Sequence, residues 1–520
     1  MLPGSYPAFH IPVLHGGWPA YFCGMNHSLH RFGLSSLVLI LSIGAQAQYT
    51  TPGTGQSYNL SDLVGISGGV ITSTSATSYL QNANFTLAAT DTLLITEDVT
   101  WAVAATASID IEGAFITNPS DQLVITSAVA GQPHQGMRFE EGSSVHLQHT
   151  SILEGGGIKC LTEDLILSHS TISDQVTNAT TGAALELFEG IAIIDHVDFL
   201  NNEMSAISSG ANIAAAPQIS HCTFQYNDYA NQNRPQINLG PSGTDTTRIL
   251  NNVVTGDVAN IMAGGIAFSS LVSVEGHVVI DSNVVTDNRY GITVTGSNVT
   301  SLITNNIITD NNTQGNGNLG GSGINLNGGV TNVSMVSGNQ IAGNLWGITL
   351  QASVTTNLGD TAAATFNPGG NSFAGNTNGG VIYALYNNTA NAVKAMNNCW
   401  DFENPGTDPA TVIVDATDIA SLGLVTFMPY SPCDITTGID QIDAAENALS
   451  VYPNPSSGEV TIRSERPMEH YALYNANGQL VRSGQWQVDR TVVLNDLQTG
   501  LYLLRAVGDG VTYGRKIVVE

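Results

Sequence analysis

Basic residues are scarce in this 520-residue chain, which has 14 Lys and Arg against 42 Asp and Glu and a formal net charge of −28. The segment between residues 50 and 440 contains only Arg138, Lys159, Arg234, Arg248, Arg289 and Lys394. Nucleic-acid binding requires a dense cationic face that displaces counterions, so this class of function is excluded. The same scarcity argues against binding a strongly anionic polysaccharide, unless metal ions bridge the two.

Charged residues of both signs make up only 11% of the chain, and no segment shows a convincing 3.6-residue period. The surface must therefore consist of uncharged polar residues and of many of the 55 glycines, a composition that favours strands and turns over helices. The hydrophobic fraction of 42% is sufficient for a large core and excludes wholesale disorder.

Long apolar runs are absent except for one near the start, at residues 34–45. It is too short for a membrane helix and is followed by Ala45-Gln46-Ala47, a pattern typical of a secretory signal cleaved before Gln48. We therefore interpret residues 1–47 as leader and signal peptide, with Met25 as the true start. The mature chain is predicted to have no transmembrane span.

Cysteine is also rare, and the predicted cleavage would remove Cys23. In an oxidising compartment the remaining four residues can form disulfides. Cys399 and Cys433 are the predicted pair because both flank one terminal segment. Cys160 and Cys222 are interpreted as small buried apolar residues.

What the chain does have is an internal repeat. A six-residue pattern (aliphatic, x, His/Asn, x, x, apolar) recurs at intervals of 20 to 33 residues, and its copies end at Ile152, Ile172, Phe199, Phe224, Val254, Val285, Ile308, Ile341, Phe373 and Trp400. A Gly-Ile step that opens a second short strand follows in several copies, as at residues 264–268 and 346–350. This pattern predicts an all-β fold in which each repeat is one coil of a right-handed parallel β-helix, with the apolar positions stacked inside.

Amide side chains recur three positions after the closing apolar residue. They are Gln175, Asn202, Asn227, Asn288, Asn311, Asn344 and Asn376, with Asp257 at the same phase. Asn tolerates the left-handed backbone of such bends, and stacked amides hydrogen-bond along the stack. We therefore predict an Asn ladder.

Over about residues 90–430 these features resemble the right-handed β-helix proteins of the pectin-lyase-like superfamily. The resemblance implies either glycoside hydrolysis by clustered Asp residues with a His, or polysaccharide lysis by Asp-bound calcium with an Arg or Lys base. The chain has no Asp-Asp dipeptide, and Gly157-Ile158-Lys159 and Arg289 are poor substitutes for the lyase base motif. No catalytic residue is predicted.

Two sets of residues offer metal ligands. His149, His169, His196 and His221 share one repeat position, where they form either a metal-binding or pH-sensitive file or a simple stack at a bend. Asp257, Asp287 and Asp310 lie at neighbouring corners, where they form either a calcium site or a solvated edge. We favour the structural interpretation of both sets and expect no cofactor, with calcium as the alternative.

The character of the chain changes after Pro432, where a polar linker at 434–447 leads to short alternating strands at 448–520. This last segment is predicted to be a small β-sandwich and resembles the type A C-terminal sorting domain of the type IX secretion system of Bacteroidota. The matching residues are Pro453, Asn454, Pro455, Gly478, Gly500, Tyr502 and Lys516. The resemblance implies the type IX secretion machinery as partner, passage through the periplasm, removal of the domain, and release or attachment at the cell surface.

The predicted organisation is therefore a leader (1–47), an N-terminal cap (48–90), a β-helix (91–433), a linker and a sorting domain. Tyr226, Tyr229, Tyr290 and Trp346 near coil corners offer either platforms for sugar rings or local packing. We expect a secreted or surface-exposed structural, adhesive or carbohydrate-binding module without an active site, whose partner is a polysaccharide or surface glycan. The alternative is a polysaccharide lyase or glycoside hydrolase of the same fold.

Overall fold

A computed structural model describes residues 48–433 except 181, and residues 449–519 except 455, 465–466, 469, 476–479, 487–489 and 509–510. The predicted leader with Met25, the linker at 434–447, and Pro455 and Gly478 of the sorting motif lie outside the described residues.

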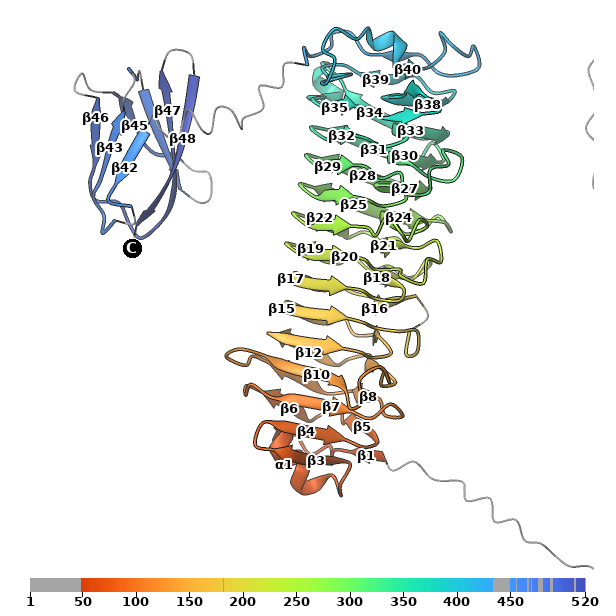
Figure 1. Cartoon of the computed structure of the whole chain (residues 1–520), viewed down its shortest axis with the longest axis vertical. Helices are drawn as coiled ribbons and strands as arrows, with labels where there is room; N and C mark the ends of the chain where they lie inside the picture. Colours follow the sequence, from red (N-terminus) through yellow and green to blue (C-terminus); the bar gives the residue numbers. More distant parts are fainter. Residues whose placement is uncertain are drawn as a thin grey trace, which may run out of the picture. The chain divides into compact units, whose positions relative to one another are not determined.

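Residues 48–433 form a parallel β-helix whose coils stack along one axis (Figure 1). One strand of each coil belongs to a 14-stranded parallel sheet, here called the first sheet. Its strands, in spatial order, are β1 (Gln48–Thr50), β5 (Asn84–Leu87), β8 (Ile109–Ile111), β11 (Met137–Phe139), β14 (Ile158–Cys160), β16 (Ala183–Leu187), β18 (Ser205–Ser209), β21 (Pro235–Leu239), β24 (Gly264–Ser270), β27 (Ile292–Gly296), β30 (Ser322–Gly328), β33 (Trp346–Ala352), β38 (Leu385–Thr389) and β40 (Ile413–Val414).

The rest of each coil contributes to a 25-stranded sheet, here called the second sheet, in which most coils supply two short strands separated by a bend. All of its pairings are parallel except that of β3 with β4. Its strands are β2 (Ser57–Tyr58), β3 (Ile71–Ser75), β4 (Ser78–Gln81), β6 (Thr92–Ile95), β7 (Thr100–Val103), β9 (Ala114–Thr117), β10 (Leu123–Ser127), β12 (Ser144–Gln148), β13 (Thr150–Leu153), β15 (Asp164–Ser173), β17 (Ile193–Leu200), β19 (Gln218–Ser220), β20 (Thr223–Gln225), β22 (Thr246–Leu250), β23 (Val253–Thr255), β25 (Gly276–Asp281), β26 (Val284–Thr286), β28 (Val299–Thr304), β29 (Ile307–Thr309), β31 (Asn332–Ser337), β32 (Gln340–Ala342), β34 (Thr355–Gly359), β35 (Ser372–Ala374), β39 (Val393–Ala395) and β41 (Val425–Thr426).

The apolar positions of the repeat lie directly above one another. Ile172 pairs with Phe199, and Phe199 with Phe224, and all three side chains are fully buried. The two Phe rings stack with centroids 5.0 Å apart and planes 3° apart. The same file continues through Val254, Val285, Ile308, Ile341 and Phe373. The parallel β-helix predicted from the repeat is thereby confirmed.

The predicted amide ladder lies at the bend that leads from the second sheet to the first. Asn202 donates through Nδ2 to Asn227 Oδ1 at 2.7 Å, and Asn288, Asn311, Asn344 and Asn376 continue the chain of bonds at 3.0 to 3.3 Å. Asp257 is not part of it: Gln236, from β21, accepts from Asn227 and donates to Asn288, both at 2.9 Å. In this coil Gln236, which comes from another position of the repeat, therefore takes the place of Asp257 in the ladder.

A second amide ladder, which our sequence analysis missed, follows the bend inside the second sheet. Each member donates through Nδ2 to the next at 2.9 Å, in the order Asn252, Asn283, Asn306, Asn339, Asn371 and Asn398. These residues occupy the fourth position of the six-residue pattern, so the signal was in the repeat itself. In the earlier coils Thr150, Ser170, Val197 and Cys222 take that position.

The N-terminal end contains a short helix, α1 (Leu60–Ile66), that no period in the sequence indicated. Asn59 and Asp62 form a capping box at its start, and Leu60 and Leu63 are buried against the first coils. Strands of the first sheet already occur within residues 48–90, where the structure places β1 and β5. The segment that we expected to be a strand-rich cap thus combines coil strands with a helix.

Cys399 and Cys433 are joined by a disulfide, with their Cα atoms 4.9 Å apart. Cys160 and Cys222 are free and buried, and burial raises the pKa of each thiol to about 12. Thiols with so high a pKa remain protonated at neutral pH and are unreactive.

The remaining short elements, near the C-terminal end of the β-helix, are β36 (Thr377–Asn378), β37 (Val381–Ile382), η1 (Ala363–Thr365) and η2 (Pro409–Thr411).

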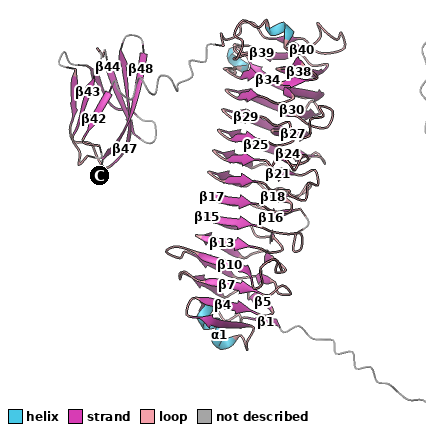
Figure 2. Ribbon diagram, in the orientation of Figure 1, coloured by secondary structure: helices cyan, strands magenta, loops and turns pink. Residues whose placement is uncertain are grey.

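The C-terminal domain has two small antiparallel sheets (Figure 2). Their strands are β42 (Leu449–Tyr452), β43 (Val460–Ser464) and β46 (Thr491–Leu494) in one, and β45 (Leu480–Gln485), β44 (His470–Asn475), β47 (Gly500–Gly508) and β48 (Val511–Val519) in the other. Asn454 accepts a hydrogen bond from the Val518 N–H at 2.8 Å, and the Tyr502 hydroxyl donates to the Gln498 carbonyl at 2.8 Å. Gly500 and Lys516 lie in the paired strands β47 and β48.

Candidate functional site

The first sheet presents one outward row of side chains along the β-helix. Strand register aligns Thr293, Asn325, Thr349 and Tyr386 on β27, β30, β33 and β38. Asn325 donates to Thr293 Oγ1 at 2.8 Å, and Thr349 donates to Asn325 Oδ1 at 3.0 Å. The side chains of Thr293, Asn325 and Thr349 are therefore held in place by bonds to one another.

A hollow of about 250 Å³ lies at the C-terminal end of this row. We call it the aromatic hollow; it is lined by Gly317, Asn318, Ser322, Trp346, Thr349, Gln351, Tyr386 and Asn388. Strands β30, β33 and β38 supply most of its lining, and the segment after β29 supplies Gly317 and Asn318. Because the hollow is built mainly on strands of a stacked sheet, its shape is fixed by the fold.

Three aromatic side chains gather at the aromatic hollow. The ring of Trp346 lies 4.6 Å from that of Tyr383 and 5.4 Å from that of Tyr386, the latter at an interplanar angle of 81°. Trp346 Nε1 donates to the Gly317 carbonyl at 3.0 Å, which fixes the indole. Trp346 is a predicted platform, whereas Tyr383 and Tyr386 lie outside the recurring pattern and are not predicted from the sequence.

Among the described residues that line the aromatic hollow, none has a charged side chain. It combines two aromatic rings with the amides of Asn318, Gln351 and Asn388 and with two hydroxyls. An apolar ring face beside fixed amide and hydroxyl groups suits a ligand that has apolar faces and many hydroxyls. A neutral sugar has this chemistry.

The N-terminal half of the first sheet carries a different set of side chains. Register aligns Asp110, Arg138, Lys159 and Glu186 on the adjacent strands β8, β11, β14 and β16, and we call them the charged row. Strand spacing places neighbouring positions about 4.8 Å apart. Of these residues only Lys159 is part of a candidate sequence motif for function, because residues 110 and 186 have no motif in common and only strand register aligns them.

Both basic side chains of this row already have partners in the fold. Arg138 donates through Nε to Glu140 at 2.7 Å, and Lys159 Nζ lies 4.6 Å from the centre of the Phe188 ring. Burial raises the pKa of Asp110, although a bond from Ser108 and the charge of Arg138 oppose the shift. Asp110 Oδ1 is buried and has no hydrogen-bond partner among the described residues.

The four predicted histidines form a file along the second sheet. Ring centroids are 5.6 Å apart for His149 and His169, 4.9 Å for His169 and His196, and 4.8 Å for His196 and His221. Each residue has a positive φ of 47° to 55°, and Asn251 and Asn305 take the same position with φ 56° in later coils. The position is therefore a left-handed bend that Asn also occupies.

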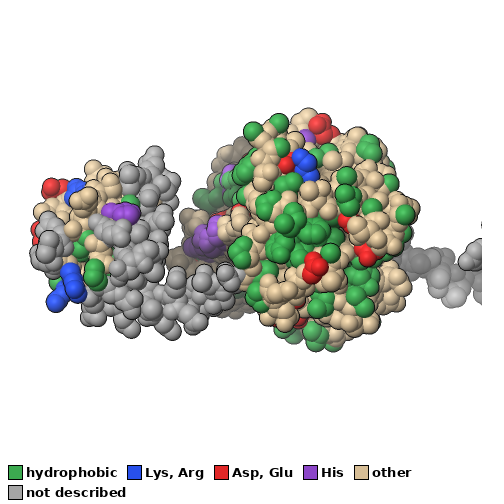
Figure 3. Space-filling model, turned by 90° about the horizontal axis from the view of Figure 1, so that it is seen from above, with side chains coloured by type: hydrophobic (Ala, Val, Ile, Leu, Met, Phe, Trp, Pro, Cys, Tyr) green, Lys and Arg blue, Asp and Glu red, His purple; other side chains and the backbone are tan. Residues whose placement is uncertain are grey.

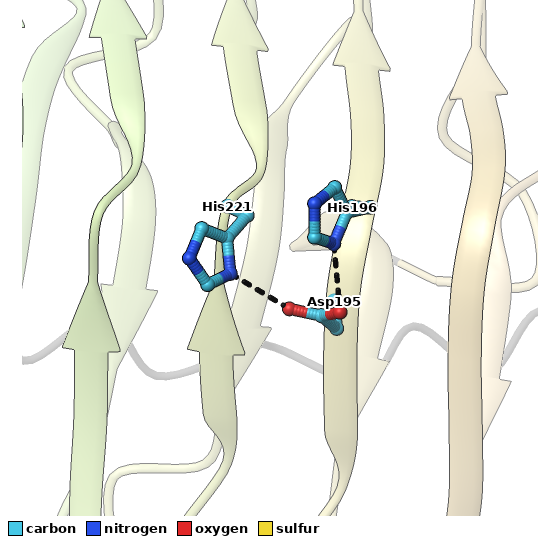
Figure 4. A group of neighbouring side chains, drawn as sticks. All are labelled: Asp195, His196 and His221. Carbon is cyan, nitrogen blue, oxygen red and sulfur yellow. Dashed lines mark hydrogen bonds and ion pairs between the residues drawn. The ribbon is translucent and has the colours of Figure 1, made fainter. Parts of the chain in front are cut away.

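One carboxylate joins two members of the histidine file (Figure 4). Asp195 Oδ2 lies 2.7 Å from His196 Nδ1, and its Oδ1 lies 3.0 Å from His221 Nδ1. Burial raises the pKa of Asp195, but hydrogen bonds from Ser220, His221 and His196 outweigh this effect and hold it well below the usual range. Among the described residues these three are the only His, Cys, Asp or Glu group placed to share a metal ion.

The predicted acidic corner does not form such a group within the described residues. Asp257 accepts from the Ala259 N–H in its own loop, at 2.9 Å. Burial and the neighbouring charge of Asp287 raise the pKa of Asp310. Arg289 is buried and donates through Nη2 to the Leu319 carbonyl, while its Nε has no hydrogen-bond partner among the described residues.

The other predicted aromatic platforms lie apart from the aromatic hollow. Tyr226 and Tyr229 are exposed, whereas Tyr290 is half-buried and covers Gly264, where a Cβ atom would lie 2.3 Å from its ring.

Figure 3 shows a surface with few basic side chains and with histidines gathered along one side of the β-helix. In the described part of the chain, no helix is both long and apolar enough to cross a membrane.

Residues 450–520 match the family described as secretion system C-terminal sorting domain. The chain therefore combines a parallel β-helix with a sorting domain of the type IX secretion system, which indicates secretion across the outer membrane and an interaction with the secretion machinery. No curated protein sequence matches the chain.

Solved structures that are similar to the chain include the following two. The periplasmic alginate epimerase AlgG has 14% identity and a TM-score of 0.27, and the match covers 72% of this chain and 82% of that one. A mutant tailspike protein of E. coli bacteriophage HK620, in complex with a pentasaccharide, has 12% identity and a TM-score of 0.27, with 84% and 86% covered. At these scores the fold assignment rests on the strand pairing described above.

Proposed function

We propose that this exported β-helix protein binds a neutral stretch of polysaccharide or surface glycan in the aromatic hollow and acts as a structural or adhesive module. The observation that carries the proposal is the pair of rings, Trp346 and Tyr386, set at 81° to each other beside uncharged amides and hydroxyls. A sugar ring stacks by its apolar face on an aromatic ring, while its hydroxyls bond to Gln351 and Asn388 at the edge.

Export places the protein where such polymers occur. The sorting domain implies that the chain crosses the outer membrane, so the aromatic hollow meets extracellular glycans. The long stack of coils holds the hollow on a rigid support, which suits an adhesive module. Removal of the sorting domain, followed by release or attachment at the surface, is part of the proposal.

A glycan array probed with the full-length labelled protein tests this function. We expect binding to neutral oligosaccharides that weakens about tenfold or more in Trp346→Ala, because truncation of a hot-spot aromatic costs about 2 kcal/mol or more. Trp346→Phe, which keeps a ring, should retain part of the binding. Tyr229→Ala, which removes an exposed ring outside the aromatic hollow, is the matched control.

Equal binding by wild type and Trp346→Ala would contradict the proposal, as would a preference for uronic-acid polymers. Unchanged far-ultraviolet circular dichroism of each variant would show that the coil is intact. Gln351→Ala and Asn388→Ala leave the indole bond to Gly317 untouched and provide a second, independent test of the same site.

The charged row favours a second candidate, a polysaccharide lyase or glycoside hydrolase. Four ionisable groups lie on adjacent strands, and a carboxyl with a raised pKa, such as Asp110, suits a general acid. A panel of polysaccharides incubated with and without calcium tests this candidate. Turnover that is lost in Asp110→Asn and in Lys159→Met would support it. We expect no turnover, because Arg138 forms an ion pair with Glu140 and the Lys159 ammonium lies over the Phe188 ring.

A further inference from the structure

We infer that Asp195, His196 and His221 form a binding site for a divalent transition-metal ion of the Zn²⁺ class. The three residues come from two adjacent coils: Asp195 and His196 lie in β17, and His221 lies between β19 and β20. One ligand atom from each lies within 4.8 Å of the other two. Sequence analysis had placed the two histidines in one file but did not include Asp195.

The donor set fits this class of ion and not calcium. Imidazole nitrogen is a preferred ligand of Zn²⁺, Ni²⁺ and Cu²⁺, and a carboxylate completes many of their sites. Calcium takes six to eight oxygen ligands, whereas these three residues offer two nitrogens and one carboxylate. The Asp195 carboxylate carries a negative charge, and the chain as a whole is strongly acidic, so the electrostatic potential at the site attracts a cation.

Binding of an ion requires the two stacked imidazole rings, whose centroids are 4.8 Å apart, to turn toward a common point. Tetrahedral ligands at 2.0–2.2 Å from an ion lie about 3.4 Å from one another. The Asp195 oxygens are 2.7 and 3.0 Å from the two Nδ1 atoms, so these contacts must lengthen slightly as the ion replaces the bound protons. The side chains of His196 and His221 are 51% and 49% exposed and can rotate, and water completes the coordination sphere.

A later coil shows that the bend does not need imidazole. Asp281 occupies the register position of Asp195 three coils further on, and it accepts from Thr304 at 2.5 Å and from Asn305 Nδ2 at 2.9 Å. Ser220 and His221 make the corresponding bonds to Asp195. Asparagine therefore satisfies the same hydrogen bond at the same positive φ, and what the two histidines add is the capacity to bind a metal ion.

The same comparison supplies the test variants. His196→Asn and His221→Asn each install a residue that this chain already accepts at that bend, in Asn251 and Asn305. Both variants should fold, and each removes one metal ligand. His149→Asn, in the same file but without contact to Asp195 in the described structure, and Asp281→Asn are the matched controls.

Isothermal titration calorimetry of the full-length untagged protein with ZnCl₂, at pH 7 in a non-chelating buffer, measures the site directly. We expect one Zn²⁺ per chain that an excess of CaCl₂ does not displace. His196→Asn and His221→Asn should each weaken binding about tenfold or more, since loss of even an outer-shell partner costs 10–100-fold. The two control variants should bind within about twofold of wild type.

Absence of Zn²⁺ binding to the wild type would overturn the inference, and so would unchanged affinity in both His→Asn variants. Electron paramagnetic resonance of the wild type with one equivalent of Cu²⁺ provides a readout that needs no variant. Hyperfine coupling to two nitrogens supports the site, and a spectrum with oxygen ligands only contradicts it.

Discussion

At the scale of single residues, the buried asparagines of the two ladders are the positions on which the bends depend. Asn306 is fully buried, and its amide donates to the Ile280 carbonyl and to Asn339 Oδ1, both at 2.9 Å. Its own Oδ1 accepts from the backbone and side-chain nitrogens of Asn283, both at 2.9 Å. Loss of this side chain leaves polar groups without partners in two neighbouring coils.

Asn306→Ala should therefore lower the free energy of unfolding of the β-helix by about 2 kcal/mol or more, the cost of several unsatisfied buried groups. Urea denaturation followed by circular dichroism measures the change. Asn305→Gly is the control, because residue 305 is an exposed neighbour and Gly338 takes the equivalent bend with φ 69°. A cost for Asn306→Ala no larger than that of the control would contradict a structural role of the ladder.

Asp91 is the second residue on which stability should depend. Its carboxylate accepts the backbone N–H groups of Gly53, Thr54, Gly55 and Gln56 at 2.8 to 3.1 Å. Burial raises its pKa, but hydrogen bonds from Thr51 and from these N–H groups outweigh this effect and lower it below 3.8. The lowered pKa means that this interaction stabilises the fold above about pH 4, and that the contribution is lost as pH falls through the folded-state pKa.

Asp91→Asn should reduce the thermal midpoint at pH 7, and the difference from wild type should shrink as pH falls below about 4. Melting curves of both proteins from pH 7 to pH 2.5 measure this difference. Asp98 also has a lowered pKa and accepts hydrogen bonds from a separate set of groups. The pH dependence of the thermal midpoint of Asp98→Asn therefore serves as a comparison for that of Asp91→Asn. A difference that is constant with pH would show that the Asp91 charge contributes nothing.

At the scale of the element, each coil is held by files of apolar side chains that only its neighbours can bury. Phe199 lies fully buried between Ile172 and Phe224. Truncation at this position leaves a cavity in three coils at once, because a rigid stack of strands relaxes only in part.

Phe199→Ala should cost about 3–5 kcal/mol of unfolding free energy, the usual range for a buried Phe. Ile193→Ala, on the same strand β17, is the matched control, because Ile193 is 44% exposed. Denaturant unfolding of the two variants compares them. A similar cost for both substitutions would be inconsistent with the stacked core.

The elements also show where sequence reasoning reaches its limit. The period of Ile172, Phe199 and Phe224 predicts the stack, because identical environments recur once per coil. The replacement of Asp257 by Gln236 has no such signal, since Gln236 comes from the first sheet and meets the ladder only in three dimensions. Helix α1 is too short to establish a period, although its capping pair Asn59 and Asp62 was visible.

The candidate sites could be predicted less completely than the fold, because prediction from this sequence depends on repetition. The histidine file repeats once per coil, so the sequence places its members side by side. Tyr386 and the charged row do not recur, and only strand register assigns them their neighbours. Asp195 has one equivalent, Asp281, but the coils between them carry Ser220 and Leu250 at this position. Repetition predicts the scaffold, whereas function depends on side chains that depart from the repeat.

At the scale of the whole molecule, export depends on the sorting domain. Removal of residues 450–520 should leave the protein inside the cells of its native host, because the signal read by the outer-membrane machinery is missing. Immunoblots of cell, surface and medium fractions measure the distribution. A full-length chain with Asn306→Ala controls for instability, and equal export of the truncated and intact proteins would contradict the assignment of this domain as the export signal.

The molecule as a whole is interpreted as a rigid support that carries the aromatic hollow to an extracellular glycan. The most direct test is a crystal structure of the protein with a neutral oligosaccharide that the array identifies. The account predicts a sugar ring stacked on Trp346 or Tyr386, with its hydroxyls bonded to Gln351 or Asn388. A sugar bound along the charged row, or elsewhere on the coil with the aromatic hollow unoccupied, would contradict it.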